Sequence, residues 1–128
     1  ARLSLYIYKN YSNISEIVKK EYQFFPETLT HKQADLINWN GTLGVYPGVY
    51  GLKIGNTGKA GKTTIVSAER EGKDITVVLL GAPGVLERDL WVSQLLDLGF
   101  AKQFGLEPVN VTEEQLREKY ASWREMVN

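Results

Sequence analysis

The sequence of 128 residues contains no cysteine and a single histidine, His31. These absences exclude disulfide frameworks, thiolate zinc sites and cysteine nucleophiles, and one histidine cannot form a histidine metal site by itself. No stretch reaches the roughly twenty apolar residues of a membrane-spanning helix. Residues 1–10 also lack the long apolar run of a signal peptide. We therefore expect no metal, no cofactor and no membrane span in this chain.

The charges are balanced, with 15 basic and 15 acidic residues. A chain without net charge has no overall field that gathers nucleic acid, so we expect no nucleic-acid partner. Hydrophobic residues make up 43% of the sequence, which is enough for a modest core. Neither a repeat nor a linker divides the chain. We expect a single domain over residues 1–128.

Short elements are expected at the start of the chain. Apolar residues at helical spacing predict a helix that ends near Asn10, and a second one, capped by Ser12 or Asn13, that runs to Val18. Aromatic and aliphatic residues predict two strands before a turn at Asn40-Gly41. These strands are expected at residues 22–25 and 37–39.

The middle of the chain predicts an antiparallel meander of three strands. An extended segment within residues 45–55 is followed by a polar loop at 56–62 and a second strand at 63–69. A turn at 70–73 leads to the apolar run 75–80, which is typical of a strand covered on both faces. A helix that ends at Gly99 is expected to pack on this sheet. A capping box of Thr112 and Gln115 predicts a last helix.

Glycine and lysine cluster between Gly55 and Thr63 in a way that first suggests a phosphate-binding loop. The spacing fails by one residue, because Asn56 stands where the first glycine is required. The segment after Thr63 is β-branched and predicts a strand, whereas a phosphate-binding loop opens a helix. We therefore interpret this cluster as a loop between two strands and not as a nucleotide site.

The residues around that loop carry a second pattern. Residues 46–55 read YPGVYGLKIG, the following strand contains Ser67-Ala68, and residues 95–100 read LLDLGF. This pattern resembles the Lys-Thr-Gly region of low-molecular-weight penicillin-binding proteins, serine-type D-Ala-D-Ala carboxypeptidases in which PGVDGLKTG is followed by an SA-x-R-x-G hairpin. Residues 53–100 carry most of the resemblance, and the first forty residues fit more loosely. The chain is thus similar to the C-terminal part of such an enzyme.

The resemblance implies an α+β fold, in which an antiparallel sheet is flanked by helices as part of a transpeptidase-like domain. The parent enzyme forms an acyl intermediate on a serine and trims peptidoglycan stem peptides in the cell envelope, and β-lactams bind at the same place. By the resemblance, Lys53 takes the role of the motif lysine and Gly55 allows a ligand to approach closely. The N–H of Asn56 is the implied oxyanion donor, and Thr57 and Arg88 are implied carboxylate ligands.

The sequence departs from the family pattern at three points. It contains no Ser-x-x-Lys motif, so the nucleophile and its base are absent and we expect the chain alone to be inactive. Ile54 replaces the motif threonine and removes a hydroxyl that donates to a carboxylate, a loss worth about 1.5–3 kcal/mol. Tyr50 stands where the family has aspartate, which affects local packing.

Other interpretations stay open. The chain is alternatively a non-catalytic module that binds a peptide along residues 53–57, or a structural piece that pairs with a companion N-terminal segment or with a copy of itself. Lys53 alone is compatible with a solvated strand lysine, and Arg88 with an ion pair to Glu87 or Asp89. We expect His31 in a loop. The aromatic residues expected in the core or at an interface are Trp39, Trp91, Tyr120 and Trp123, and the residues expected on the solvated face of the last helix are Glu113, Glu114, Arg117, Glu118 and Lys119.

Overall fold

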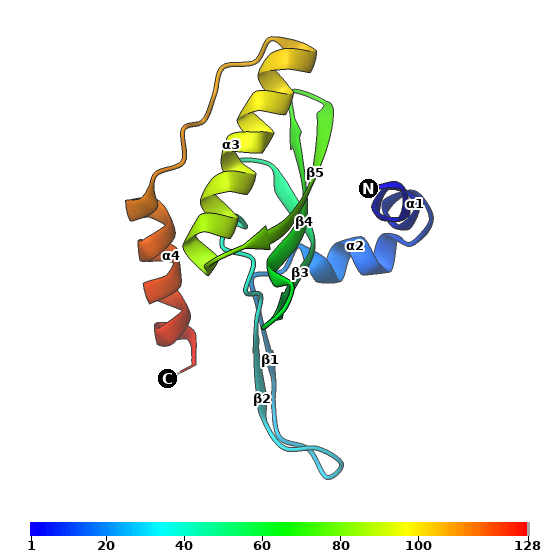
Figure 1. Cartoon of the computed structure of the whole chain (residues 1–128). Helices are drawn as coiled ribbons and strands as arrows, with labels where there is room; N and C mark the ends of the chain where they lie inside the picture. The colour runs from blue at the N-terminus through cyan, green and yellow to red at the C-terminus, as the bar shows by residue number, and fades with distance from the viewer. Residues whose placement is uncertain (128) are drawn as a thin grey trace.

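The structure, a computed structural model, describes residues 1–127 as four helices and five strands. The helices are α1 (Arg2–Asn10), α2 (Ser12–Val18), α3 (Val85–Phe104) and α4 (Glu113–Met126). The strands are β1 (Tyr22–Phe25), β2 (Ala34–Ile37), β3 (Val49–Thr57), β4 (Gly61–Arg70) and β5 (Lys73–Ala82) (Figure 1). Within residues 1–127, none of the helices combines the length and the hydrophobicity that a bilayer crossing requires.

The body of the molecule is an antiparallel sheet with the strand order β3-β4-β5. Figure 1 shows α3 on one side of this sheet, with α1 and α2 on the other side and α4 beyond α3. Strands β1 and β2 form a separate two-stranded hairpin that projects from the body. The prediction of an α+β fold with an antiparallel sheet flanked by helices is confirmed.

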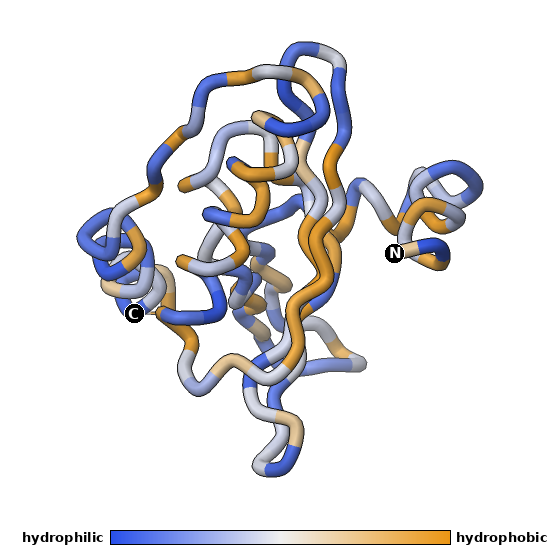
Figure 2. The backbone as a smooth tube through the Cα atoms, turned by 45° about the horizontal axis from the view of Figure 1, so that its top comes forward, coloured by the Kyte–Doolittle hydropathy of each residue, from blue (hydrophilic) through white to orange (hydrophobic). Residues whose placement is uncertain are grey.

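The core lies between α3 and the sheet. Val66 is opposite Val77 in the β4–β5 ladder, and Ala68 is opposite Ile75, so these side chains share one face of the sheet. They are buried with three residues of α3, which are Val92, Leu96 and Phe100. Figure 2 shows the hydrophobic run of β5 in the middle of the molecule and the hydrophilic turn that joins it to β4. Because burial of each large apolar side chain contributes about 1.5–3 kcal/mol, this contact fixes α3 on the sheet.

The opposite face of β5 is open, so the expectation of a strand covered on both faces is wrong for the described residues. Val78 and Leu80 are exposed, Leu80 to 74%. The reason is that the helices on this side lie over β3: Tyr8 of α1 packs edge-on against Tyr50, and Val18 of α2 lies against Gly51. Within residues 1–127, β5 therefore has no neighbouring strand at its outer edge, and its face turned away from α3 is exposed at Val78 and Leu80.

The helices agree with the sequence except at their ends. Helix α3 continues through Gly99 to Phe104, and Gly105, in the left-handed conformation with φ 65°, is its C-cap. Helix α2 is preceded by Tyr11 as N-cap instead of Ser12 or Asn13, and no side chain caps it. The capping box of Thr112 and Gln115 at α4 is confirmed.

The strand boundaries also differ from the expected ones. The second strand of the hairpin is Ala34–Ile37, because Asn38 turns its side chain to the backbone of α2 and Trp39 leaves the ladder. Strand β3 continues through Asn56 and Thr57, so the predicted loop at 56–62 shrinks to the turn at 58–60. The meander itself, and the strand at 22–25, are confirmed.

A buried carboxylate directs the chain from α3 to α4. Asp97 accepts hydrogen bonds from the Tyr46 hydroxyl at 2.9 Å and from the backbone N–H groups of Val109 and Asn110 at 2.8 and 3.0 Å. Burial, together with the neighbouring Asp97 carboxylate, raises the pKa of Tyr46 to about 12, so its hydroxyl remains a donor at neutral pH. These bonds hold the connecting segment and allow α4 to return alongside α3.

Gly48 offers a test of the turn that leads into β3. Its φ is +81°, its carbonyl accepts from the Glu69 N–H at 3.0 Å, and an added Cβ meets the Glu69 carbonyl oxygen at 1.8 Å. Gly48→Ala is therefore expected to prevent folding or to cost more than about 3 kcal/mol, which is the upper range for single substitutions. Gly72→Ala is the control, because it has a similar φ of +71° but open space, and should cost about 1–2 kcal/mol. Equal losses in urea-induced unfolding would contradict this account.

Candidate functional site

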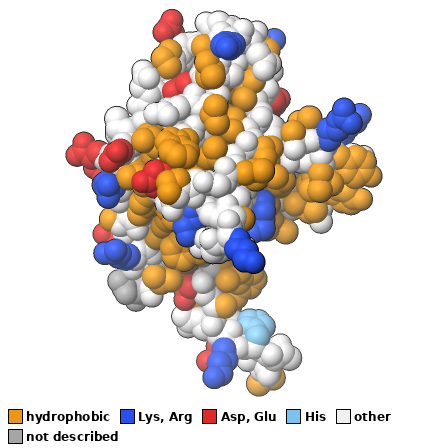
Figure 3. All heavy atoms as spheres, in the orientation of Figure 1, with side chains coloured by type: hydrophobic (Ala, Val, Ile, Leu, Met, Phe, Trp, Pro, Cys, Tyr) orange, Lys and Arg blue, Asp and Glu red, His pale blue; other side chains and the backbone are white. Residues whose placement is uncertain are grey.

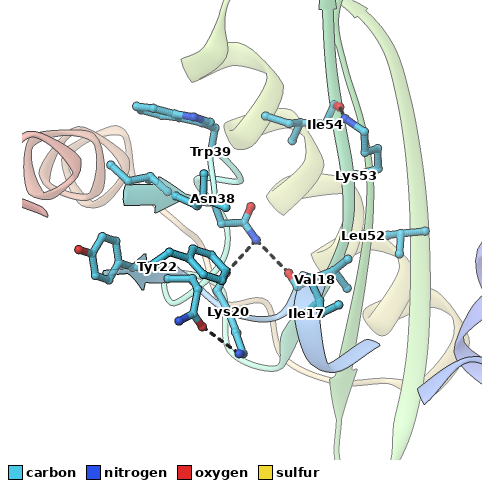
Figure 4. Close-up of a pocket in the computed structure, with 13 residues that line it drawn as sticks. Ile17, Val18, Lys20, Tyr22, Asn38, Trp39, Leu52, Lys53 and Ile54 are labelled. Atoms are coloured by element: carbon cyan, nitrogen blue, oxygen red, sulfur yellow. Dashed lines mark hydrogen bonds between the residues drawn. The ribbon is translucent and has the colours of Figure 1, made fainter. Parts of the chain in front are cut away.

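A groove of about 450 Å³ lies between the hairpin and β3. Its walls are the end of α2, the hairpin and the strand residues Leu52, Lys53 and Ile54, and Asn38 and Trp39 also line it (Figure 4). Asn38 donates to the carbonyls of Val18 and Lys20 at 2.9 and 3.0 Å, which joins the hairpin to α2. The groove therefore combines segments that are more than thirty residues apart in the sequence.

The lining of the groove is apolar and positively charged. Thirteen residues line it, and among them Lys20 and Lys53 are charged while none is acidic. Lys20 Nζ donates to the Gln23 side chain at 3.0 Å and Lys53 Nζ to the Ile54 carbonyl at 2.5 Å. Neither lysine belongs to an ion pair within the described residues. Two unneutralised ammonium groups in an apolar groove suit a ligand with an apolar body and a carboxylate.

The backbone of β3 adds hydrogen-bonding groups to this groove. Within residues 1–127, strand β3 pairs only with β4 and is therefore an edge strand. The Thr64 hydroxyl donates to the Lys53 carbonyl at 3.3 Å, so that carbonyl faces β4. Since successive residues of an antiparallel strand alternate between the two sides, the N–H and C=O groups of Ile54 and Asn56 point to the open edge. The candidate oxyanion donor, the Asn56 N–H, is thus directed away from the sheet.

The other strand residues singled out in the sequence lie around this edge. Gly55 is opposite Thr63, whose hydroxyl fills the place of a Cβ at 2.5 Å, so a side chain at position 55 would collide with β4. The Thr57 hydroxyl accepts from the Ala60 N–H at 3.0 Å and keeps its own hydrogen for donation. Ile54 lines the groove and presents no hydroxyl to it.

Tyr50, the second departure from the family pattern, has a packing role. It sits at an irregularity of β3, between the paired residues Val49 and Gly51. Its ring packs edge-on against Tyr8 at a centroid distance of 4.8 Å, and its hydroxyl donates to Asp74 at 2.9 Å. Burial, and then the Asp74 carboxylate, raise the pKa of Tyr50. Tyr50 therefore ties α1 to the sheet away from the groove.

Arg88 lies at the start of α3 in a buried ion pair. Its Nε and one terminal nitrogen donate to the two oxygens of Asp89 at 2.7 and 3.0 Å, and it also donates to the Trp39 carbonyl at 2.9 Å. The side chains of Arg88 and Asp89 are 3% and 1% exposed. Asp89 also accepts from the Tyr120 hydroxyl of α4 at 2.8 Å. The ion-pair partner of Arg88 is thus Asp89, one of the two carboxylates considered in the sequence analysis. The role of Arg88 in binding a ligand carboxylate stays a prediction.

The remaining candidates divide between the surface and the interior. His31 lies in the loop at the tip of the hairpin, as expected. Trp123 is buried, whereas Trp39 and Trp91 are substantially exposed and do not belong to the core. Lys119 was expected in solvent but is largely buried in an ion pair with Glu21, so this expectation is wrong. No group of three or more His, Cys, Asp or Glu side chains in residues 1–127 is placed to hold a metal ion.

Lys20 and Trp39 are among the groove residues that the sequence did not suggest as ligand contacts. Neither belongs to a recognisable motif, and both reach the groove through the base of the hairpin. They are found only in the structure, where Lys20 precedes β1 and Trp39 follows β2. Asn38 brings these two positions together by hydrogen bonds to the carbonyls of Val18 and Lys20.

Comparisons with known proteins point to one family. No family model matches the sequence. The chain is 33% identical over 81 residues to the D-alanyl-D-alanine carboxypeptidase DacF of Bacillus subtilis (strain 168), which covers 63% of this chain and 21% of that protein. Penicillin-binding protein D2 of Listeria monocytogenes in the cefotaxime-bound form has a TM-score of 0.66 and 31% identity, over 77% of this chain and 38% of that one. The Streptomyces K15 DD-transpeptidase has a TM-score of 0.66 and 27% identity, over 73% of this chain and 37% of that one.

Sequence and fold agree on the class, since both relate the chain to part of a transpeptidase-like penicillin-binding domain. The chain resembles the C-terminal part of a D-alanyl-D-alanine carboxypeptidase of the low-molecular-weight penicillin-binding type. The chain spans about a fifth of the length of its curated relative and less than two fifths of these structural neighbours.

The buried ion pair of α3 gives a test of how this region is held. Arg88→Met leaves the Asp89 carboxylate buried without its counter-charge and should cost about 3–5 kcal/mol in urea-induced unfolding. The control is Arg117→Met, which breaks an exposed pair with Glu113 on α4 and should cost less than about 0.5 kcal/mol. A small loss in the Arg88 variant would show that Asp89 finds another partner or solvent.

Proposed function

We propose that this chain provides the substrate-binding strand of a serine-type D-Ala-D-Ala carboxypeptidase that trims peptidoglycan stem peptides outside the cytoplasmic membrane. The observation that carries the proposal is the groove along the open edge of β3, which contains Lys20 and Lys53 and no carboxylate. Its relatives support it, since they include a D-alanyl-D-alanine carboxypeptidase and a penicillin-binding protein with bound cefotaxime or ampicillin.

The ligand is a peptide that ends in D-Ala-D-Ala, and it lies along β3 as an added strand. Its backbone pairs with the outward groups of Ile54 and Asn56, and its carboxylate lies near the Lys53 ammonium. In the complete enzyme, Lys53 is the motif lysine, the Asn56 N–H stabilises the oxyanion, and Gly55 keeps the strand flat against β4. A β-lactam with its own carboxylate uses the same contacts.

Two further carboxylate contacts follow from the family resemblance. The Thr57 hydroxyl keeps a hydrogen to donate, and it compensates in part for the hydroxyl that Ile54 lacks. Arg88 contributes only if its guanidinium leaves Asp89, which would strand a buried carboxylate at a cost of several kcal/mol. Lys53 is therefore the principal charge partner of the ligand.

These 128 residues bind without cleaving. Acyl transfer requires a nucleophile and a base within hydrogen-bond reach of one another, and the sequence contains no Ser-x-x-Lys motif to supply them. In this proposal, the motif is contributed by another part of the domain, and the strand β3 contributes charge and hydrogen-bond donors.

A structural function is the second candidate. Leu3 and Leu5 of α1, Ile17 of α2 and Leu80 of β5 are exposed, and Figure 3 shows hydrophobic side chains gathered over α1 and α2. The edge of β5 is also unpaired within the described residues. A companion N-terminal segment, or a second copy of the chain, would cover these surfaces and make the chain an assembly module.

The binding function is tested by NMR titration of the isotope-labelled chain with a peptide ending in D-Ala-D-Ala. Backbone signals of residues 53–57 should shift, and a peptide ending in L-Ala should leave them unchanged.

Lys53→Met should weaken binding about tenfold, as expected for the loss of one charged contact. Ile54→Thr should strengthen it by up to about tenfold, whereas Ile54→Val keeps the branched shape without the hydroxyl and should have no such effect. Equal responses to both peptides would refute the proposed ligand.

The two candidates differ in their state of association. Sedimentation analysis across a range of concentrations should give a monomer if binding at β3 is the function of the isolated chain. A dimer that dissociates when Leu80→Lys adds a charge beside the open β5 edge would favour the structural function.

A further inference from the structure

The hairpin is a wall of the groove, yet it belongs to a different sheet from β3. It is therefore held by contacts at its base, where Glu21 precedes β1 and Asn38 and Trp39 follow β2. The Asn38 N–H donates to the Glu21 carbonyl at 2.9 Å. This bond joins the two legs of the hairpin, by which we mean the residues just before β1 and just after β2. The direction in which the hairpin leaves the body depends on what holds these legs.

Helix α4 holds both legs with one face. Lys119 and Trp123 are four residues apart, so their side chains project from the same side of the helix. Lys119, only 10% exposed, forms an ion pair with Glu21 at the start of the first leg. Trp123, which is buried, packs edge-on against Trp39 after the second leg, at a centroid distance of 4.9 Å and an interplanar angle of 78°.

A second route connects α4 to the same leg. Tyr120 donates to Asp89, Asp89 accepts from Arg88, and Arg88 donates to the Trp39 carbonyl at 2.9 Å. Burial, and then the neighbouring Asp89, raise the pKa of Tyr120, so the phenol remains a donor at neutral pH. The ring of Trp39 is thus fixed by Trp123 and its backbone by Arg88. Trp39 itself is one of the residues that line the groove (Figure 4).

We propose that α4 positions the hairpin against β3, with Lys119 and Trp123 as positioning residues that set the width of the groove and hence its affinity for the D-Ala-D-Ala peptide. This inference rests on the proposed function, because it assigns α4 a role at the same site. Helix α4 does not touch the ligand. It acts through Glu21 and Trp39, which are joined directly to the two strands of the hairpin.

The contact with Glu21 distinguishes positioning from general stabilisation. Neither Lys119 nor Glu21 belongs to the core cluster between α3 and the sheet. Lys119→Met removes the charge of the buried partner and leaves the Glu21 carboxylate, which is 43% exposed, in contact with solvent, so little stability should be lost. It nevertheless releases one of the two legs, so the hairpin should move while β4 and β5 stay folded.

The experiment measures the position of the hairpin and the affinity of the groove in the same variants. The chain lacks cysteine, so Leu29→Cys at the exposed hairpin tip and Lys59→Cys in the turn after β3 accept two spin labels at unique sites. Electron–electron double resonance then gives the distribution of distances across the groove. Lys119→Met should broaden this distribution and weaken binding of the D-Ala-D-Ala peptide about threefold to fivefold, which corresponds to the loss of about 1 kcal/mol.

Two further variants distinguish the effect of losing the Lys119–Glu21 ion pair from the effect of any substitution in α4. The exchange Glu21→Lys with Lys119→Glu restores opposite charges and should recover both the narrow distribution and the affinity. Arg117→Met, on the exposed side of α4, should change neither. An unchanged distribution in Lys119→Met, or a broadened one with unchanged affinity, would overturn the inference. If the unaltered chain binds no peptide, the proposed function fails, and the distances still decide whether α4 sets the hairpin.

Discussion

The buried carboxylate of Asp89 is the interaction on which the arrangement of the molecule depends. It joins three parts of the chain: its own helix α3, the segment after the hairpin through Arg88, and α4 through Tyr120. A charge buried to this degree is tolerated only when it is paired and fully hydrogen-bonded. The network therefore favours this arrangement of the hairpin base, α3 and α4, because separating them would leave a buried charge without its partner.

This junction explains how a small chain keeps a groove open. The apolar core orders β3, β4, β5, α3 and α4 but leaves the hairpin outside. Polar and aromatic contacts at the hairpin base then fix the second wall at a distance from β3. Burial of apolar side chains, which has no preferred direction, holds the layers of the body together. Hydrogen bonds and ring contacts, which are directional, set the angle between the hairpin and the sheet, which share no strand.

The fold was largely predictable because local patterns determine it. Alternating and continuous apolar runs gave the meander, and the capping box of Thr112 and Gln115 gave the start of α4. The prediction that the helix ends at Gly99 is wrong. In a sequence, a glycine that ends a helix cannot be distinguished from one that lies inside a helix against a neighbouring side chain, which here is Ile75. The β-strand residues around Lys53 could be proposed from the motif. Lys20, Trp39 and the Lys119–Glu21 pair could not, because their roles arise from contacts between segments that no local pattern connects.

The open edge of β3 has a consequence for solubility as well as for recognition. An unpaired strand presents the same row of N–H and C=O groups to a substrate and to the edge of another molecule, and self-association through such edges is a common cause of aggregation. Lys53 on the strand and Lys20 across the groove place two positive charges beside this edge. When two copies approach edge to edge, like charges meet, whereas an incoming carboxylate meets attraction. Under the proposed function, the two lysines therefore favour an anionic strand at this edge and disfavour the strand's own copy.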